Sequence, residues 1–322
     1  MPTQSLDITA IPSELKKYVE ANPEIITDLV QDGFQQINKD FDIRYAQDEE
    51  VITNMRVMDI LRVASDDFTP VKAAEFGYRK WKMQEVDADV FIPRSQIISL
   101  ANSWLRTSKR VGSVQEVLDN PFETFFLREI IQGQGLFLRE NSSWKGDADS
   151  AQTGSLYAVD GLIFKLVTAT SGGEIPAGHV VAAPADLSTS DEAVYEHIQA
   201  MCDKYADVLP RMAESSAEIR LSRKMKQRYD RGRRAKFPDS VGPNDKALTP
   251  DDYENMKFVI DVGLAGKETI VITPPQNLFF GTDGGQNRLT IDPQVKGWNV
   301  NLFFRCAFDF AYGKFIVRNN KV

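Results

Sequence analysis

The side chains that could carry out metal or thiol chemistry are few and widely separated in this sequence. The histidines are His179 and His197, and the cysteines are Cys202 and Cys306. His197 and Cys202 lie five positions apart, which on a helix places them on different faces. No CxxC or HExxH spacing occurs. We therefore expect no metal site and no cofactor, and we expect both cysteines to be reduced, packed thiols.

The motifs of nucleophilic catalysis and of phosphate binding are also missing. The sequence contains no GxSxG, no GxxxxGK[ST] and no GxGxxG that follows a strand. The glycines of FGTDGGQNR, residues 280–288, precede a strand, so this stretch predicts a hairpin turn. Paired carboxylates such as Asp66-Asp67 lie in polar stretches and indicate solvated surface. Because no acid, base and nucleophile converge, the sequence predicts a protein that is not an enzyme.

Positive charge is concentrated in one segment of an acidic chain. The 322 residues carry a net charge of −8, which argues against a surface that grips nucleic acid throughout. Between residues 220 and 236, nine Lys or Arg side chains face the single acid Asp230. This segment either binds phosphates through counterion release or forms a solvated helix face whose positive charges balance acidic patches elsewhere on the protein. We favour the second interpretation, because only Tyr229 is placed among the charges for base stacking.

The elements that must position these residues begin with an arm and a hairpin. Residues 11–41 predict two short amphipathic helices, which need another surface to cover their apolar stripe. Residues 57–92 predict two extended strands with a turn between them. In the second strand the apolar side chains change from odd positions, up to Met83, to even positions, from Val86 onward. This change predicts a bulge near Gln84. Since an isolated hairpin is marginal in water, this one also needs an external partner surface.

Later segments predict a mixture of helices and strands. A helix begins at Asn120, and its apolar stripe consists of Phe122, Phe126, Ile130 and either Leu136 or Phe137. Gly133 and Gly135 weaken this helix locally, which indicates a kink or a close backbone approach. The stretch after Asp160-Gly161 predicts a strand. Thr189 with Glu192 predicts a capping box for a helix that ends at Leu209. The side chains expected to face inward on this helix are Val194, Ile198, Met201, Tyr205 and Val208. The last strand has large apolar side chains at every second position, namely Trp298, Val300, Leu302, Phe304, Cys306, Phe308 and Phe310.

The bulk properties bound the class of protein. Hydrophobic residues make up 42% of the chain, so it can bury a core, and its length favours two lobes or a body with extensions. The N-terminal sequence shows no secretory signal, and no apolar run reaches membrane-spanning length. We expect a protein made in a cytoplasm.

The order of these elements resembles the major capsid proteins of tailed bacteriophages, which have the Hong Kong phage capsid fold, shared with encapsulins. The likeness rests on KWKMQEVDADVFIP, which ends the hairpin, and on PFETFFLREIIQGQGLFLRENSSWKGD as a long spine helix. YAVDGLIFKLV then enters the next domain, and ITPPQNLFFGTDGG precedes the terminal strand.

The resemblance implies an α+β fold of four parts. These are an N-terminal arm (1–45), an extended hairpin loop (46–93), a peripheral domain with the spine helix (94–160 and 271–322) and an axial domain (161–270). It also implies a structural protein that self-assembles into pentamers and hexamers, in an icosahedral or prolate shell around packaged double-stranded DNA. Portal, scaffold or decoration proteins are the further partners implied, with no membrane and no sequence-specific DNA binding. The expected location is the virion capsid, assembled in the host cytoplasm.

Two sets of site residues follow from this resemblance. The extended loop would contact a neighbouring subunit through Phe68, Lys72, Phe76, Tyr78, Lys80, Trp81 and Lys82. The basic segment would lie near the capsomer axis with Arg223, Lys224, Lys226, Arg228, Arg231, Arg233 and Arg234. Two alternatives stay open. One is an encapsulin-like compartment shell, and the other is a nucleic-acid-binding module that uses residues 220–236.

Overall fold

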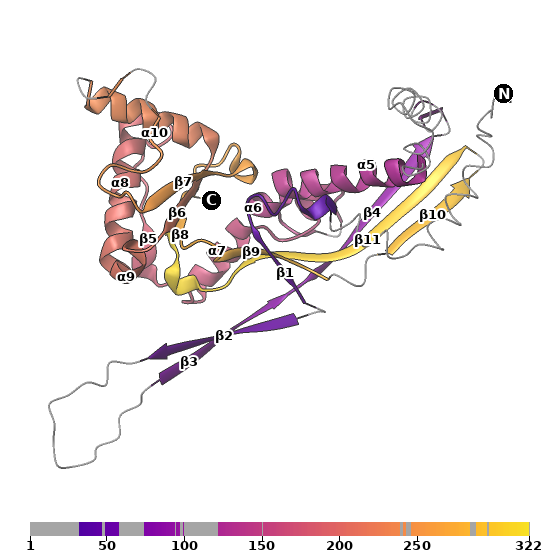
Figure 1. Ribbon diagram of the computed structural model, residues 1–322, viewed down its shortest axis with the longest axis horizontal. Coiled ribbons are helices and arrows are strands. Elements are labelled where there is room, and N and C mark those ends of the chain that lie inside the picture. The colour runs from indigo at the N-terminus through magenta and orange to yellow at the C-terminus, as the bar shows by residue number, and fades with distance from the viewer. Residues whose placement is uncertain are drawn as a thin grey trace, which may run out of the picture.

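The computed structural model has two units, each with its own sheet and core, and a two-stranded hairpin that projects away from both (Figure 1). The structure describes residues 32–46, 49–57, 74–93, 95–96, 99, 122–149, 151–238, 241–242, 246–283, 288–294 and 296–321. None of the helices within these ranges combines the length and hydropathy needed to cross a bilayer.

The first unit, here the elongated unit, is organised by the long strand β11 (Gly297–Phe310). β4 (Gln84–Pro93) pairs with it antiparallel along one edge, and β10 (Arg288–Gln294) and β9 (Leu278–Thr282) pair antiparallel with it as well. β1 (Asp42–Tyr45) adds a parallel strand beside β9. The seven alternating apolar side chains predicted for the last strand are all buried, so the period of two is confirmed.

The spine helix α5 (Phe122–Phe137) runs along this sheet, followed by one π-helical turn η1 (Leu138–Ser142) and α6 (Ser143–Lys145) (Figure 1). Ile130 of the predicted stripe is partly buried against the core, and the neighbouring Leu127 and Ile131 are fully buried. Leu136 and Phe137, at the end of the helix, are 39% and 51% exposed. The helix contacts the arm closely at Gly135, where a Cβ would collide with the backbone of Gly33.

Residues 162–171 correct a second expectation, since they form the helix α7 (Leu162–Ser171) rather than a strand. Leu162, Leu166 and Ala169 are buried, and their spacing of four and three is that of one helix face. Gly161 precedes the helix, and a Cβ there would collide with the backbone of Gly146, so the chain enters α7 through a close backbone contact.

The second unit, here the compact unit, has a five-stranded sheet in the order β5-β12-β8-β6-β7. These strands are β5 (Val180–Val181), β6 (Ala217–Leu221), β7 (Met256–Ile260), β8 (Val271–Thr273) and β12 (Val317–Asn319). The helices α8 (Asp191–Val208) and α10 (Arg223–Lys236) pack together and cover a core with the sheet. The short helix α9 (Pro210–Ala213) follows α8.

The cap of α8 is one residue later than predicted, because the Ser190 side chain accepts the bond from the Ala193 N–H at 3.2 Å. The predicted inward face is largely right: Val194, Ile198, Met201 and Tyr205 are buried, while Val208 is partly buried. Four 3-10 turns complete the described elements: η2 (Ser155–Tyr157), η3 (Ala177–His179), η4 (Val262–Leu264) and η5 (Gly313–Phe315).

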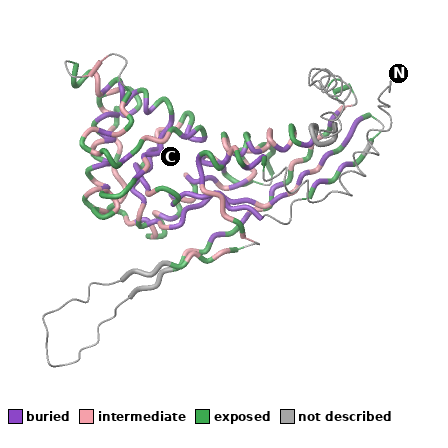
Figure 2. The backbone as a smooth tube through the Cα atoms, viewed as in Figure 1, coloured by how far each residue is buried: buried purple, intermediate pink, exposed green. Residues whose placement is uncertain are grey.

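The strand pairing divides the chain differently from the predicted boundary at residue 271. β8 and β12 belong to the sheet of the compact unit, although the sequence groups residues 271–322 with the spine helix. Conversely, α7 packs into the core of the elongated unit. The chain therefore crosses between the units several times, and each unit has its own cluster of buried residues (Figure 2).

The hairpin consists of β2 (Glu49–Val57) and β3 (Ala74–Lys82), paired antiparallel from Glu49↔Lys82 to Val57↔Ala74. At Met83 the chain leaves β2 and joins β11 as β4, so the predicted bulge near Gln84 is instead a change of partner strand. The predicted arm helices lie outside the described residues up to position 31. Beyond it, residues 32–34 are helical and turns follow to residue 40. Phe34, Ile37 and Phe41 of this segment are buried in the elongated unit.

Candidate assembly surfaces

The root of the hairpin is fixed to the body by Arg79 on β3. Its guanidinium binds the carboxylate of Asp309 at 2.6 Å and also pairs with Glu174. The same group stacks 3.8 Å from the ring centroid of Phe310. Asp309 is 4% exposed, and burial raises its pKa, an effect that Arg79 opposes. A buried, multiply bonded ion pair of this kind sets the direction in which the hairpin leaves the body.

Trp81 lies on the same face of the hairpin as Arg79 and is 1% exposed. Its ring contacts Phe279 edge-on with centroids 5.1 Å apart, and it covers Gly281, where a Cβ would collide with the indole. The prediction that Trp81 contacts a neighbouring subunit is therefore wrong. The parity of β3 turns this side chain into the core of its own subunit.

The opposite face of the hairpin is open to solvent. Tyr78 is 80% exposed and Val51 is 50% exposed, while Lys80 and Lys82 are exposed as well. Lys80 pairs with Glu49 across the strands. This face of the two-stranded extension therefore exposes an aromatic and an aliphatic side chain together, a pattern common at interaction sites. Of the other predicted contact residues, Phe68 and Lys72 lie outside the described residues, and Phe76 is described only as part of β3.

The basic segment forms α10, and most of its charges are paired within the subunit. Arg228 and Arg231 bind the two oxygens of Asp191 at 2.8 and 2.6 Å, which lowers the pKa of that carboxyl. Arg233 binds Asp251 at 2.8 Å. Further pairs join Lys226 to Asp230 and Lys236 to Glu196. These contacts favour the interpretation in which the segment forms ion pairs with acidic residues of its own unit.

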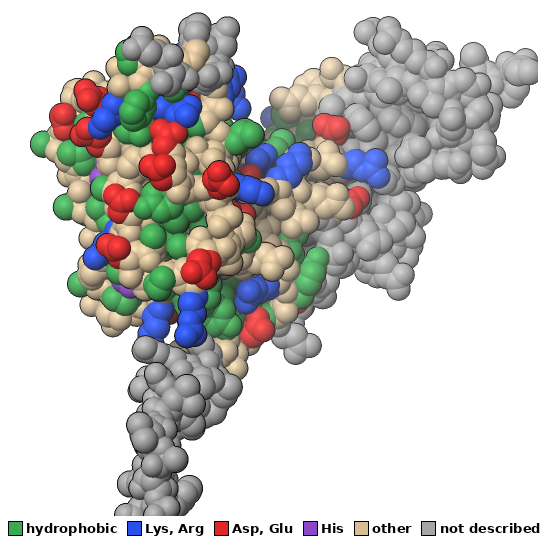
Figure 3. Space-filling view, turned by 60° about the vertical axis from the view of Figure 1, so that its left-hand side comes forward, with side chains coloured by type: hydrophobic (Ala, Val, Ile, Leu, Met, Phe, Trp, Pro, Cys, Tyr) green, Lys and Arg blue, Asp and Glu red, His purple; other side chains and the backbone are tan. Residues whose placement is uncertain are grey.

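Tyr229, the residue expected to stack on bases, is fully buried against Tyr195 and Phe258. Arg223 and Lys224 are exposed at the start of α10. Figure 3 shows Lys and Arg side chains scattered among Asp and Glu over the compact unit rather than gathered in one patch. A nucleic-acid-binding module built on this helix thus lacks both its stacking platform and most of its free cations.

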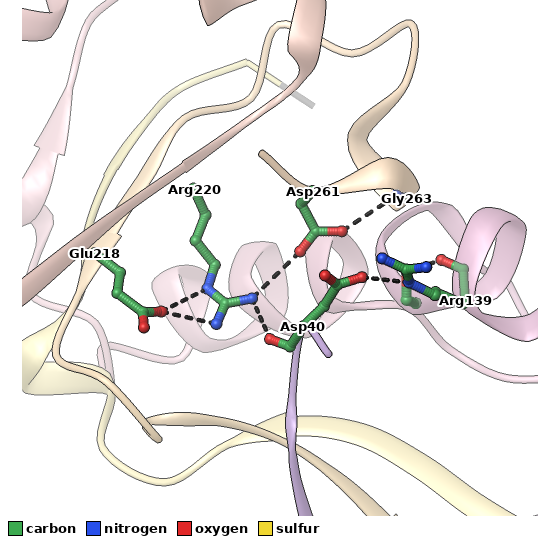
Figure 4. A network of polar contacts seen from close by, with 7 residues as sticks. Asp40, Arg139, Glu218, Arg220, Asp261 and Gly263 are labelled. Carbon is green, nitrogen blue, oxygen red and sulfur yellow. Dashed lines mark hydrogen bonds and ion pairs between the residues drawn. The ribbon is translucent and has the colours of Figure 1, made fainter. Parts of the chain in front are cut away.

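A cluster of charged side chains lies where the two units meet (Figure 4). Arg220 on β6 binds Glu218 at 2.7 Å and Asp261 at 3.3 Å, and it donates to the backbone oxygen of Asp40. The Asp40 carboxylate in turn accepts a bond from Arg139 at 2.5 Å. The sequence analysis did not find this cluster, because its members are far apart in the chain; the contact of Arg220 with Asp40 alone joins residues 180 positions apart.

The histidines and cysteines lie apart from these surfaces. Burial lowers the pKa of His197 to about 4 and raises the pKa of both Cys202 and Cys306. His179 is near the backbone oxygen of Ile316, at 3.1 Å from its Nδ1. Among the described residues, no three His, Cys, Asp or Glu side chains are grouped to hold a metal ion.

Comparison with known proteins gives a likeness in structure alone. No model of a protein family matches the sequence, and neither does any curated protein. A chain from the satellite phage P4 procapsid that includes the size determination (Sid) protein matches with a TM-score of 0.53 and 12% identity. The match covers 93% of this chain and 90% of that one.

Two further solved structures match less closely. The capsid of the Myoviridae phage XM1 has a TM-score of 0.47 and 9% identity, and it covers 87% of this chain and 88% of that one. The holo-SrpI encapsulin complex from Synechococcus elongatus has a TM-score of 0.45 and 10% identity, with 88% and 86% covered. The chain has the fold of phage capsid shell proteins, as the order of its elements predicts.

Proposed function

We propose that this chain is the major capsid protein of a tailed phage and that it assembles into pentamers and hexamers around packaged double-stranded DNA. The observation that carries the proposal is the likeness to a procapsid chain over 93% of the sequence. A second observation supports it: the anchored hairpin presents exposed Tyr78 and Val51 away from its own body.

In this proposal the hairpin lies over a neighbouring subunit, with Tyr78, Val51, Lys80 and Lys82 as its contact residues. Each such contact is heterologous, and heterologous contacts form rings when the rotation between subunits closes. A single contact can be modest, because interfaces of about 800 Å² per partner become strong together when each subunit holds several neighbours. The arm upstream of residue 32 would supply further contacts.

The charge of the chain suits a container for DNA. A net charge of −8 repels the phosphate backbone, which lets a genome pack and leave without adhering to the wall. The ion pairs of α10 support the same view, since most of the basic side chains pair with carboxylates of the same subunit and not with phosphates. Portal, scaffold or decoration proteins are the further partners in this proposal, and the virion is the final location.

Negative-stain electron microscopy with light scattering on the purified protein tests the proposal. We expect closed shells or capsomer rings, and nuclease treatment of shells from infected cells should leave a protected double-stranded genome. Shells that protect a protein cargo and no DNA would instead establish the encapsulin-like alternative. A monomer that persists over a range of salt and protein concentrations, with purified scaffold also supplied, would overturn the assembly proposal.

A further inference from the structure

The cluster at the junction of the two units has an uneven charge. It comprises the carboxylates of Asp40, Glu218 and Asp261 and the guanidiniums of Arg139 and Arg220, so one negative charge has no equivalent cation. Asp40, Arg220 and Asp261 are 7%, 5% and 1% exposed, whereas the side chains of Arg139 and Glu218 are 16% and 23% exposed. Around the three buried residues, burial excludes the water that would otherwise compensate a charge.

Asp261 receives the weakest compensation of the three carboxylates. Arg139 forms an ion pair with Asp40 at 2.5 Å, and the shortest ion pair of Arg220 is with Glu218, at 2.7 Å. Asp261 is left with one Arg220 contact at 3.3 Å, although its side chain is fully buried. Its other oxygen accepts the Gly263 N–H at 3.1 Å. The remaining charged groups on the elements packed against it are Glu140 of η1 and Lys145 of α6.

We propose that this cluster is an acid-tightened joint, which holds the two units in one orientation when Asp261 is protonated and loosens when its carboxyl ionises. The joint includes the end of the arm. Arg220 donates to the Asp40 backbone while Arg139 binds the Asp40 carboxylate, so Asp40 is bonded to both units at once (Figure 4). Loosening the joint therefore frees residues 34–41 together with the contact between the units.

The sign of the pH dependence follows from the protonation of each state. Burial raises the pKa of Asp261 from 3.8 to about 6, and Arg220 opposes the shift. Between these values the folded chain binds a proton that the unfolded chain does not, so this group adds stability as the pH falls through 6 toward 4. The contribution is lost as the pH rises above 6. His197 acts in the opposite sense, because its pKa is lowered, and it must therefore be held constant.

Asp261→Asn tests the joint, because asparagine can still accept the Gly263 N–H but cannot ionise. Relative to this variant, the folded-to-unfolded ratio of the natural chain should rise up to about a hundredfold between pH 7 and pH 4. Hydrogen exchange in residues 34–41 and 262–264, corrected for its intrinsic rate, should slow from pH 7 to pH 5 in the natural chain alone. His197 is present in both proteins, so its effect cancels.

Asp309→Asn is the matched control, since Asp309 is also a buried acid but lies at the hairpin root. It should leave the pH dependence of exchange in residues 34–41 unchanged. If Asp261→Asn keeps the natural pH dependence of exchange at the joint, the proposal is overturned. Light scattering at each pH must show one assembly state, which separates this result from any failure to form shells.

Glu218→Gln provides an independent test should the asparagine variant not fold. Removing the Glu218 charge leaves Arg220 free to compensate Asp261. The joint should then loosen at a lower pH than in the natural chain. A transition at the same pH in both proteins would also overturn the proposal.

Discussion

Single side chains decide how closely the arm and the spine helix approach. Gly33 of the arm lies against Ile131, and Gly135 of α5 lies against Gly33. A side chain at either glycine would occupy space that the opposing backbone already fills. The pair therefore fixes the point at which the arm crosses the helix, and no other residue type fits there without moving one of the two segments.

Gly135→Ala should lower the free energy of unfolding by about 1–3 kcal/mol, the usual cost of overpacking. Gly133→Ala is the matched control, because it lies in the same helix and a Cβ there meets nothing within 4 Å. That variant should gain up to about 1 kcal/mol from better helix propensity. Urea unfolding of both variants checks the pair, and an equal response would contradict the close contact.

At the scale of elements, the region around Met83 decides where the hairpin ends and the body begins. β3 pairs with β2 up to Lys82, and β4 pairs with β11 from Gln84 onward. Gln84 donates to the Asp160 side chain at 3.0 Å and accepts the Asp160 N–H at 2.8 Å. These bonds and the Arg79 anchor hold both sides of the switch, so the two sheets keep a defined relation.

Arg79→Ala should lower the free energy of unfolding by about 3 kcal/mol, because it leaves the buried Asp309 without an opposite charge. Lys80→Ala serves as the control, since Lys80 is the next residue on the same strand and its side chain is exposed. That change should be too small to resolve. Thermal and urea unfolding of the free subunit measure both, and similar losses would argue against the anchor.

At the scale of the whole molecule, the anchored hairpin and the two units make one subunit whose exposed face suits a neighbour. Figure 1 shows the hairpin away from both cores, and Figure 2 shows buried residues at its root. Trp81 stabilises the subunit, whereas Tyr78 is available to another molecule. One face of the two strands packs into the subunit, and the proposed assembly contact uses the other face.

Tyr78→Ser should reduce shell formation at least about tenfold without changing the stability of the free subunit, because truncating an interface aromatic commonly costs about 2 kcal/mol per contact. Leu248→Ser is the control, since Leu248 is similarly exposed, at 83%, but lies in the compact unit. Light scattering and electron microscopy compare the assembled fractions. Normal assembly by the Tyr78 variant would contradict the proposal that this face of the hairpin contacts a neighbouring subunit.

The sequence by itself determined the features that repeat at short range. The period of two in β11, the inward face of α8 and the order of arm, hairpin, spine helix and terminal strand all follow from the spacing of apolar residues. That order was enough to indicate the capsid fold. Local signals placed α5 and the helix at 223–236, and they also indicated that Gly135 marks a weak point or a close approach.

Only the tertiary structure decided which partners those elements take. The spacing of apolar residues in 162–171 is compatible with a strand or a helix. Packing of Leu162, Leu166 and Ala169 into the core of the elongated unit decides for the helix. The ion pair of Arg79 with Asp309 joins residues 230 positions apart. Arg220 on β6 pairs with Asp261, which follows β7, and donates to the backbone oxygen of Asp40 in the arm. The residues next to Arg79 and Arg220 in the sequence do not show whether each arginine is solvated or buried. Burial is a property of the packed chain, and the buried charges became visible only there.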